Sequence, residues 1–219
     1  MTSKISIILC TYNEANYIEN TISALKNNIK NLEIIIVDDN SKDGTKEIIN
    51  KLNINNEMKV IFREKAQGLA SAFLRGLIET TGDKIGWVDT NMSELAPKFN
   101  EMDNLLNTGN DIIILSRYTK NGGDHRTLLR SMTSKYFNIF CSLIFRQSIK
   151  DYTSSIFLMK RHVLNEVSFL GYGHGEFFIE FLYNAYKKKF KILEIPFIQK
   201  MDENQADSKS APNLLKFIY

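Results

Sequence analysis

Short runs rich in isoleucine and valine alternate with segments of helical periodicity through residue 117 of the chain. Because these runs are apolar at nearly every position, they are typical of strands that are covered on both faces. Repeated strand and helix predict an α/β fold with a mostly parallel, Rossmann-like sheet, right-handed crossovers and helices on both sides. The expected strands are 4–12, 32–39, 58–64, 84–89 and 111–117, and the expected helices are 16–27, 44–53, 69–81 and 96–108.

The alternation ends at residue 117, and longer helical segments follow. The expected helices are 126–147, 162–170 and 175–190, the expected strands are 154–161 and 191–198, and a polar tail begins at residue 199. With 219 residues, of which 43% are hydrophobic and 24% charged, the chain suits a single domain, 1–219.

Targeting and redox signals in the sequence are weak. No stretch is apolar over the roughly 20 residues that a membrane-spanning helix needs. The apolar run at the N-terminus is too short for a signal peptide and is better suited to a core strand. Because Cys10 and Cys141 are the only cysteines and lack metal-ligand spacing, we expect a reduced, cytoplasmic protein.

Polar side chains follow four of the expected strands at the point where each strand ends. They are Thr11 to Glu14, Asp38 to Asn40, Asp89 to Asn91, and the pair Ser116 and Arg117. In open α/β sheets, ligands bind outside the carboxyl ends of the strands. Four polar ends that converge on one edge therefore indicate a binding site at that edge.

The segment after the fourth strand, GWVDTNMSEL, indicates a site for a divalent cation. Asp89 supplies a carboxylate, Asn91 a neutral amide oxygen and Ser93 a hydroxyl, and hard cations such as Mg²⁺ prefer oxygen ligands. An amide in place of a second carboxylate weakens the attraction to a dication, by roughly a few kcal/mol before water relaxes. We therefore expect a cation to bind weakly alone, and more tightly with the nucleotide that the family resemblance below implies. The alternative is that DTNMSE is only a polar turn after a buried strand.

Two further loops have both a structural and a functional interpretation. In VDDNSKDGT, Asp38 and Asp39 either hold a turn closed by Gly44 or accept hydrogen bonds from a nucleobase or ribose. In REKAQGLASAFLRG, Gly68 and the small residues after it open a helix where backbone can approach a ligand. This second loop lacks a full phosphate-binding pattern, so a tight strand-to-helix turn is the alternative.

The motifs taken together resemble those of the family 2 glycosyltransferases. The chain contains, in this order, CTYNEANYIENTI, IIIVDDNSKDGT, KAQGLASAFLRG, WVDTNMSE, ILSRYTKNGG, DYTSSIF and GEFFIEFLYNAYKKKFKILEIPFIQ. The chain is most similar to the branch that makes dolichol-phosphate or polyprenyl-phosphate mannose or glucose. The resemblance implies an A-type glycosyltransferase fold with amphipathic C-terminal helices, a nucleotide sugar donor, a lipid phosphate acceptor, Mg²⁺ or Mn²⁺, and inversion at the anomeric carbon. It also implies a nucleotide-sugar-binding half, 1–117, and an acceptor and membrane-facing half, 118–219.

The resemblance assigns roles to individual residues as well. The nucleotide-binding residues that it implies are Thr11, Tyr12, Glu14, Asp38, Asp39, Lys65 and Gly68. The implied metal ligands are Asp89, Asn91 and Ser93. The implied acceptor-phosphate residues are Arg117, Ser208 and Lys209, the last two in a tail that we expect to be mobile and to close over the site. The implied catalytic residues are Asp89, Arg117 and Lys209.

Four positions depart from the family pattern. Asn91 replaces an aspartate, Glu203 stands where an arginine is usual, Ala206 where glycine is usual, and Phe178 where a polar side chain is common. These departures bear on the strength of catalysis and the choice of substrate rather than on the fold. A degenerate nucleotide-sugar-binding protein, or an enzyme that works without a metal, is therefore an open alternative.

A lipid phosphate acceptor needs no strong general base, because it is already ionised near neutral pH, with a second pKa around 6. The protein then has to position it and to stabilise the departing nucleoside diphosphate. His125, His162 and His174 lie in no catalytic motif. We expect inverting transfer of a hexose from a donor of the GDP-mannose or UDP-glucose type to a polyprenyl or dolichyl phosphate. The alternative is a saccharide or glycan acceptor, for which Glu176 or Glu180 would supply the base that such an acceptor needs.

The chain from Arg117 to Lys150 carries seven basic side chains and one acidic side chain. Apolar residues recur within it at three- and four-residue intervals, as in an amphipathic helix. Such a helix fits an anionic membrane surface, and we expect a peripheral protein at the cytoplasmic face of the membrane. A core helix with a solvated face is the alternative. No motif for reading nucleic acid accompanies the charge, so no nucleic-acid partner is expected, and a homo-oligomer is left open.

Overall fold

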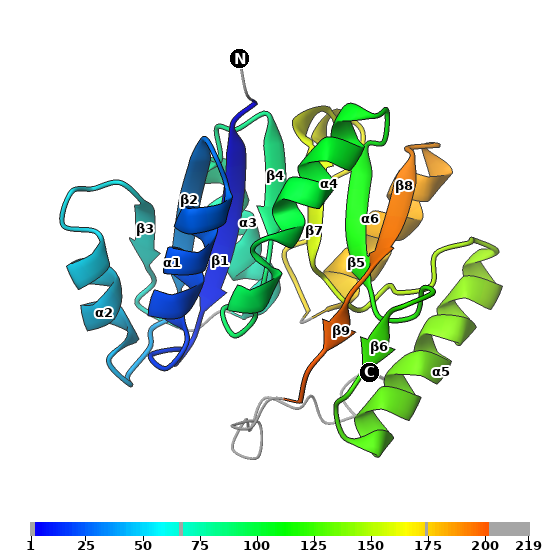
Figure 1. Ribbon diagram of the computed structural model, residues 1–219, viewed down its shortest axis with the longest axis horizontal. Helices are drawn as coiled ribbons and strands as arrows, with labels where there is room; N and C mark the ends of the chain where they lie inside the picture. The colour runs from blue at the N-terminus through cyan, green and yellow to red at the C-terminus, as the bar shows by residue number, and fades with distance from the viewer. Residues whose placement is uncertain (1–2, 66–67, 174, 202–219) are drawn as a thin grey trace.

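Seven strands form one sheet, to which both the first and the second half of the chain contribute (Figure 1). The computed structural model describes residues 3–65, 68–173 and 175–201. The strands are β1 (Ile5–Thr11), β2 (Leu32–Asp38), β3 (Lys59–Phe62), β4 (Lys84–Trp87), β5 (Ile112–Ser116), β7 (Phe157–Lys160) and β8 (Ile192–Pro196). Their order is β3-β2-β1-β4-β7-β5-β8, and only the pairs that involve β7 are antiparallel. The mostly parallel sheet expected from the sequence is confirmed.

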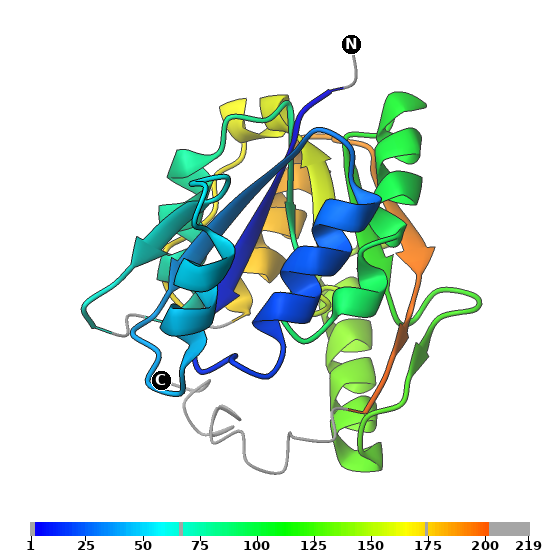
Figure 2. The same ribbon diagram turned by 60° about the vertical axis from the view of Figure 1, so that its left-hand side comes forward.

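Helices cover both faces of this sheet (Figures 1 and 2). One face carries α1 (Ile18–Asn28), α2 (Thr45–Leu52) and α4 (Lys98–Asn107). The opposite face carries α3 (Leu69–Glu79) and α6 (Glu176–Lys187). The described elements thus form three layers, as the alternation of strands and helices predicts.

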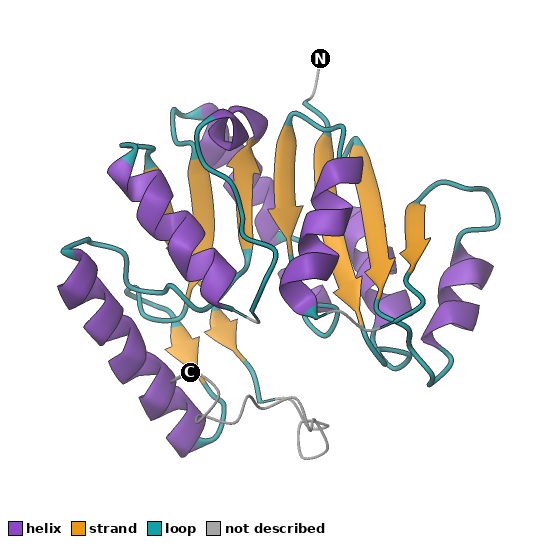
Figure 3. Cartoon of the chain, turned by 180° about the vertical axis from the view of Figure 1, so that it is seen from behind, coloured by secondary structure: helices purple, strands orange, loops and turns teal. Residues whose placement is uncertain are grey.

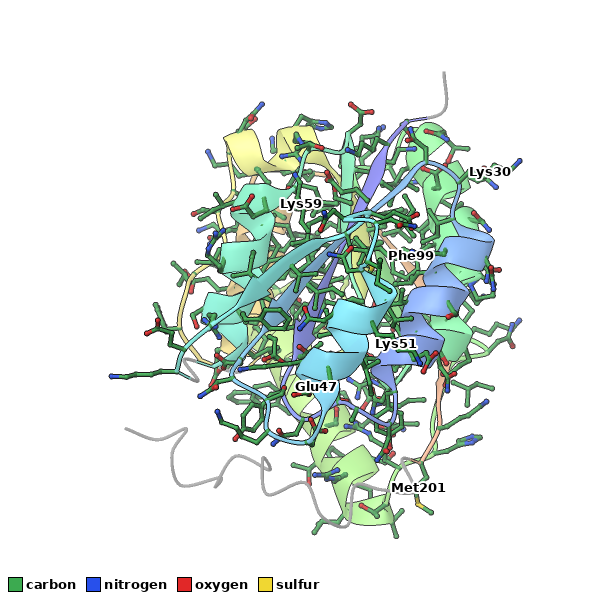
Figure 4. The ribbon with its side chains drawn as sticks, turned by 90° about the vertical axis from the view of Figure 1, so that its left-hand side faces the viewer. Lys30, Glu47, Lys51, Lys59, Phe99 and Met201 are labelled. Carbon is green, nitrogen blue, oxygen red and sulfur yellow. The ribbon has the colours of Figure 1, made fainter. Side chains whose placement is uncertain are left out.

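Apolar side chains from the strands join these layers. On the face of α1, α2 and α4, Ile7 and Ile36 of the strands pack in one cluster with Ile22 and Phe99 of the helices. Figure 4 shows Phe99 inside the molecule and Lys30 pointing away from it. The uninterrupted isoleucine runs are explained by this arrangement, because alternate residues of each strand serve the two faces.

The opposite face is packed with aromatic rings. Trp87 of β4 and Phe73 of α3 each lie with their ring centroid 5.6 Å from that of Phe177 on α6. Phe178, at a position where a polar residue is common in the family that the sequence resembles, is fully buried and stacks 5.3 Å from Phe157. The packing gives this phenylalanine a structural role in the core.

Two local expectations are wrong. Segment 162–170 contains only a short 3₁₀ turn, η2 (Arg161–Asn165), and then chain without regular secondary structure. Val167 and Phe169 are both buried, and residues two apart do not share one face of a helix. The expected strand 191–198 divides after Pro196, and its end forms a second sheet from β6 (Gly123–Asp124) and β9 (Ile198–Gln199).

Helix α5 (Leu128–Phe145) extends beyond the carboxyl ends of the parallel strands, beside β6 and β9, and contacts α6 near its C-terminal end (Figures 1 and 3). Of its 18 residues only Asn138 and Cys141 are buried. Nine of its large apolar side chains are exposed: Leu128, Leu129, Met132, Tyr136, Phe137, Ile139, Phe140, Leu143 and Ile144. Across the parts of the chain that the structure describes, no helix has the length and apolar character needed to span a membrane.

Candidate functional site

The carboxyl ends of the parallel strands meet at one edge of the sheet (Figure 3). Thr11 lies opposite Asp38 in the register of β1 and β2, and the chain continues from the end of β4 through Val88 to Asp89. Strand β7 runs in the opposite direction between β4 and β5, so the segment that precedes it lies at this edge too. The polar strand ends expected from the sequence therefore share one edge, and they share it with residues 151–156.

Asp38 is bound within the protein. Its side chain is fully buried, and its carboxylate accepts hydrogen bonds from the Thr11 hydroxyl (3.0 Å), the Ser41 amide (3.0 Å) and the Ser41 hydroxyl. The Lys46 ammonium lies 4.0 Å from it. These contacts fix the turn after β2, which is the structural interpretation of this motif. A direct contact of Asp38 or Thr11 with a nucleotide stays a prediction.

Asp39 joins the loop after β2 to the loop before α3. Its carboxylate accepts a hydrogen bond from the Gly68 amide (2.9 Å) and lies 2.6 Å from Nη2 of Arg63. The Arg63 guanidinium also donates to the Ser71 hydroxyl (2.7 Å) and the Gly68 carbonyl (3.1 Å). Gly68 has φ 89°, a conformation that favours glycine. Arg63 is absent from the residues expected above, although its place directly after β3, at the edge where the other polar strand ends meet, is a signal for it.

Three expected nucleotide-binding residues lie at the rim of this edge. Tyr12 has 56% of its surface exposed, and Lys65 is exposed as well. Glu14 is half-buried, and its backbone amide donates to the Thr45 hydroxyl at 2.9 Å. An exposed aromatic ring can stack on a nucleobase, and an exposed ammonium can meet a phosphate.

Asp89 is the least compensated charged group that the structure describes at this edge. Its side chain is partly buried, and its carboxylate has no hydrogen bond or ion pair with any residue in 3–65, 68–173 or 175–201. Burial raises the pKa of Asp89 to about 6. A carboxylate withdrawn from water without donors is an arrangement that a bound cation compensates.

The turn after Asp89 presents further oxygen atoms. The Thr21 hydroxyl donates to the Thr90 carbonyl and so ties the turn to α1. Asn91 and Ser93 follow, both partly exposed. No group of three or more Asp, Glu, His or Cys side chains that could hold a metal ion occurs among the described residues. The carboxylate, amide and hydroxyl oxygens of Asp89, Asn91 and Ser93 nevertheless fit Mg²⁺ or Mn²⁺, which bind such oxygens.

Cys10 of β1 lies near three of the charged groups at this edge. Burial raises the pKa of its thiol, the negative charge of Asp89 raises it further, Arg63 lowers it, and Asp39 raises it. All three charged residues therefore lie close enough to Cys10 to act on it electrostatically. The register of the sheet agrees, because β1, which carries Cys10, pairs on one side with β2, which leads to Asp39, and on the other side with β4, which leads to Asp89.

Arg117 is buried, with 2% of its side chain exposed, and protein groups hold its guanidinium. Nε and Nη2 donate to the two carboxylate oxygens of Asp151 at 2.8 and 2.7 Å, a bidentate pair. Nη2 also donates to the Thr153 hydroxyl (2.7 Å), and Nη1 donates to Gln199 (3.1 Å) and lies 3.7 Å from Asp124. Burial alone would lower the pKa of Arg117, but Asp151 outweighs burial and raises it. A contact with an acceptor phosphate stays a prediction, and it would have to share the guanidinium with these partners.

The remaining candidates line a separate cavity or fall outside the described residues. Glu176 and Glu180 line an open cavity of about 360 Å³ with Phe145, Ile179, Tyr183 and Asn184, at the place where the end of α5 meets α6. Asp39, Arg63 and Asp89 do not line it. Residues that fall outside the described part of the chain are His174, Glu203, Ala206, Ser208 and Lys209.

Comparison with known sequences gives a consistent result. Residues 6–168 match Glycosyl transferase family 2. The chain is 32% identical to the dolichol-phosphate mannosyltransferase of Pyrococcus furiosus, over 99% of this chain and 63% of that protein. It is 30% identical to the cholesterol galactosyltransferase of Borreliella burgdorferi, over 52% of this chain and 32% of that protein. The chain thus spans less than two thirds of the length of either relative.

Solved structures share the fold. The glucosyl-3-phosphoglycerate synthase of Mycobacterium tuberculosis, in complex with Mn²⁺, UDP and glucosyl-3-phosphoglycerate, gives a TM-score of 0.66 at 19% identity over 90% of this chain and 70% of that chain. TarS 1–349 of S. aureus gives a TM-score of 0.62 at 19% identity over 90% of this chain and 60% of that chain. The A-type glycosyltransferase fold expected from the sequence is confirmed.

Proposed function

The chain belongs to glycosyl transferase family 2, and we propose that it moves one hexose from a nucleotide sugar to a polyprenyl or dolichyl phosphate. The observation that carries the proposal is the Asp89 carboxylate, which has no partner among the described residues and lies near the Arg63–Asp39 pair. A partly buried charge left open in this way suits a cation-bridged diphosphate. The name of the Pyrococcus furiosus relative, which pairs a mannosyl group with dolichol phosphate, supports the class of acceptor.

The donor would be of the GDP-mannose or UDP-glucose type and would lie along the ends of β1 and β2. Tyr12 offers an exposed ring for the base, and Asp39 is the acidic group for the base or ribose. Lys65 and the backbone at Gly68 stand on the neighbouring loop. The UDP in the Mycobacterium tuberculosis structure shows that a chain with this fold can bind a nucleoside diphosphate.

Asp89, Asn91 and Ser93 would hold Mg²⁺ or Mn²⁺, which when bound neutralises charge on the departing nucleoside diphosphate. Among these three proposed ligands, Asp89 contributes one full negative charge, and Asn91 and Ser93 contribute neutral oxygens. We therefore expect cation and nucleotide to bind together, since the diphosphate supplies the charge that a second carboxylate would give.

The acceptor phosphate attacks the anomeric carbon of the hexose. The new carbon–oxygen bond forms as the bond to the nucleoside diphosphate breaks, and the configuration inverts. Because the phosphate is already ionised, the step needs orientation and charge stabilisation rather than a strong base. Arg117 carries positive charge at the sheet edge, and Ser208 and Lys209 are proposed to complete the phosphate site.

Helix α5 is proposed to place the protein on the cytoplasmic face of a membrane. Its exposed apolar side chains need a covering, and no acidic residue occurs from 125 to 150, a stretch that contains five Lys and Arg residues. An anionic bilayer surface supplies both an apolar layer and negative charge. Because α5 extends beyond the carboxyl ends of the strands (Figure 1), a lipid-linked acceptor at that surface would face the donor.

Transfer is tested directly by incubating the chain with Mn²⁺, a short-chain polyprenyl phosphate, and either GDP-mannose or UDP-glucose. We expect a glycosylated lipid phosphate, detected by mass spectrometry, with one of the two donors. Transfer to an oligosaccharide instead, abolished by Glu176→Gln or Glu180→Gln, would favour the saccharide-acceptor alternative. Nucleotide-dependent thermal stabilisation with no product from any acceptor would favour a degenerate binding protein.

Membrane contact is tested by sedimentation with vesicles that contain anionic lipid but no acceptor. We expect binding at low salt that weakens at high salt and falls strongly in Leu129→Gln/Leu143→Gln. The matched control is Ile78→Gln, because Ile78 is 78% exposed on α3, away from α5. Equal binding by both variants would remove α5 as the membrane-facing element.

A further inference from the structure

The segment Asp151–Ser155 lies between the two charged strand ends of the site. It directly precedes β7, whose first residue Phe157 lies opposite Trp87 on β4 and opposite Ile114 on β5. Continuing these two antiparallel registers places the segment beside the end of β4, which leads to Asp89, and beside the end of β5, which leads to Arg117. Ser155 has φ 59°, a left-handed conformation that is costly for a serine. Such strain persists only where surrounding contacts over-determine the backbone.

Those contacts centre on the side chain of Thr153. Its hydroxyl accepts hydrogen bonds from Nη2 of Arg117 (2.7 Å) and from Nδ2 of Asn138 (2.8 Å). Its own hydrogen can go to Asp151 or to Ser134, each 3.3 Å away. A hydroxyl has one hydrogen and two acceptor positions, so all the bonding capacity of this group is used.

Asn138 carries the connection into α5. It is one of the two buried residues of that helix, and its Nδ2 also donates to the Ser134 carbonyl at 2.8 Å. Its Oδ1 accepts a hydrogen bond from the Tyr152 amide at 2.6 Å. Besides the apolar contacts of Cys141 and Phe145 near its C-terminal end, the exposed helix is therefore attached to the sheet edge through a polar contact. The other side of this contact is the buried guanidinium of Arg117.

We propose that Thr153 is a positioning residue for glycosyl transfer, which locks α5 and Arg117 into one rigid unit. The inference rests on the proposed function, in which α5 holds the protein at the surface where the lipid acceptor lies. With the lock in place, the distance between that surface and the donor edge is set by the fold. Without it, α5 stays folded but its placement relative to the edge varies, so acceptor molecules reach the anomeric carbon less often.

A matched pair of substitutions isolates the hydroxyl. Thr153→Val keeps the shape and removes the hydroxyl, whereas Thr153→Ser keeps the hydroxyl. In steady-state transfer to a polyprenyl phosphate embedded in vesicles, we expect Thr153→Val to raise the acceptor KM about tenfold and leave the donor KM unchanged, because two buried donors lose their shared acceptor. We expect Thr153→Ser to stay within about twofold of the parent, since the same hydrogen bonds can form.

Tyr152→Phe is the control for a general loss of stability. It removes a buried hydrogen bond of 3.0 Å to Gln147 in the same segment, but that bond has no link to Arg117. We expect it to lower the melting temperature without raising the acceptor KM. An acceptor KM that rises equally in Tyr152→Phe and Thr153→Val, or that does not rise in Thr153→Val, overturns the proposal.

Hydrogen exchange separates this proposal from the proposed function, because it requires no activity. The backbone amide of Arg117 donates to Asp151 at 2.9 Å, so its protection reports on the same cluster. We expect Thr153→Val to increase exchange at the Arg117 amide and in α5 together, with Tyr152→Phe leaving the Arg117 amide unchanged. If the parent transfers no sugar to any lipid phosphate, the proposed function fails. Unchanged exchange in Thr153→Val overturns the lock between α5 and Arg117.

Discussion

Glu33 and Asp89 are carboxylates at opposite ends of the same sheet, and their surroundings differ. Glu33, near the start of β2, accepts hydrogen bonds from the Ser6 hydroxyl (2.5 Å), the Thr81 amide (2.7 Å) and the Lys4 ammonium (2.9 Å). Burial alone would raise the pKa of Glu33, but these hydrogen bonds outweigh it and hold the pKa well below its usual range. Asp89, at the end of β4, receives no such donor from the described residues, and burial raises its pKa to about 6.

This difference separates a charge that supports the fold from a charge that is kept for a ligand. A buried carboxylate with several donors stabilises the native state relative to the same carboxylate left without them. A partly buried carboxylate without donors destabilises the native state until something else compensates it. Such groups cluster at functional sites, which is why Asp89 rather than Glu33 marks the site.

Arg117 shows that a position at the functional edge is not sufficient. It lies at the same end of the sheet as Asp89, yet Asp151, Thr153 and Gln199 already accept hydrogen bonds from its guanidinium. Removing it would leave the Asp151 carboxylate buried and uncompensated, which costs about 3–5 kcal/mol in comparable pairs. Loss of activity in an Arg117 variant would therefore not by itself identify a phosphate contact.

The largest effect that follows from this comparison is on transfer in Asp89→Ala. We expect turnover to fall by about a hundredfold or more, because loss of one electrostatic stabiliser of the transition state typically costs a factor of 10² to 10³. The measurement is the steady-state rate with saturating donor and Mn²⁺. Glu101→Ala is the matched control, since Glu101 is an exposed carboxylate on α4 that pairs with Lys98. Similar rates in the two variants would place Asp89 outside the reaction.

The next effect is on stability, in Glu33→Gln. One Glu33 oxygen accepts from Lys4 and the Thr81 hydroxyl, and the other accepts from Ser6 and the Thr81 amide. In Glu33→Gln an NH₂ group, which is itself a donor, replaces one of these two oxygens and faces the donors that bonded to it. We therefore expect a loss of about 1–3 kcal/mol in the free energy of unfolding. Urea unfolding measures this loss. A variant as stable as the parent would show that the hydrogen bonds to Glu33 do not stabilise the fold. The contrast with Asp89 would then have no energetic basis.

Acid sensitivity extends the same comparison. Because the folded-state pKa of Glu33 is lowered, its contribution to stability is complete above the unfolded pKa of about 4.3 and is lost as the pH falls below it. We expect the parent to lose more unfolding free energy than Glu33→Gln between pH 6 and pH 3, because the variant has no carboxylate to protonate. Parallel losses in the two proteins would contradict the lowered pKa.

The smallest effect is expected from Asn91→Asp. A second carboxylate after Asp89 raises the charge of the cation site, and ligand charge is one of the factors that set affinity for divalent cations. We expect Mn²⁺ to bind about tenfold more tightly in the presence of GDP or UDP, which corresponds to about 1.4 kcal/mol. Isothermal titration of both proteins measures this change. Unchanged affinity would mean that position 91 faces no cation.

The parts of the structure that depend on local pattern could be predicted from the sequence. The isoleucine run of β2 is buried at every position from Glu33 to Asp38, and continuous burial of this kind is what such a run predicts for a strand covered on both faces. The parallel direction of the strands then placed Asp38 and Asp89 at one edge, because the carboxyl ends of parallel strands coincide. The location of the candidate site followed from these two features.

The parts that depend on pairing between distant residues could not be predicted in this way. Asp151 lies 34 positions after Arg117, and nothing near either residue indicates that they form a buried ion pair. Gln199, 82 positions away, approaches only because the chain leaves β8 to pair with β6. The ion pair of Arg63 is equally hard to predict from the sequence, because its partner Asp39 belongs to the loop after another strand. Residue type gives the chemistry of such groups, but their availability depends on the partners that the fold brings to them.

The most direct test of the account is thermal unfolding of Asp89→Asn beside Glu33→Gln, each with and without Mn²⁺ plus GDP and Mn²⁺ plus UDP. Asparagine keeps the shape of Asp89 and removes the charge that has no partner among the described residues. We predict that Asp89→Asn without ligand melts at or above the parent temperature and loses the ligand-induced increase, whereas Glu33→Gln melts lower and keeps that increase. A lower melting temperature for ligand-free Asp89→Asn, together with an undiminished ligand-induced increase, would contradict the claim that this carboxylate is kept for a cation-bound nucleotide.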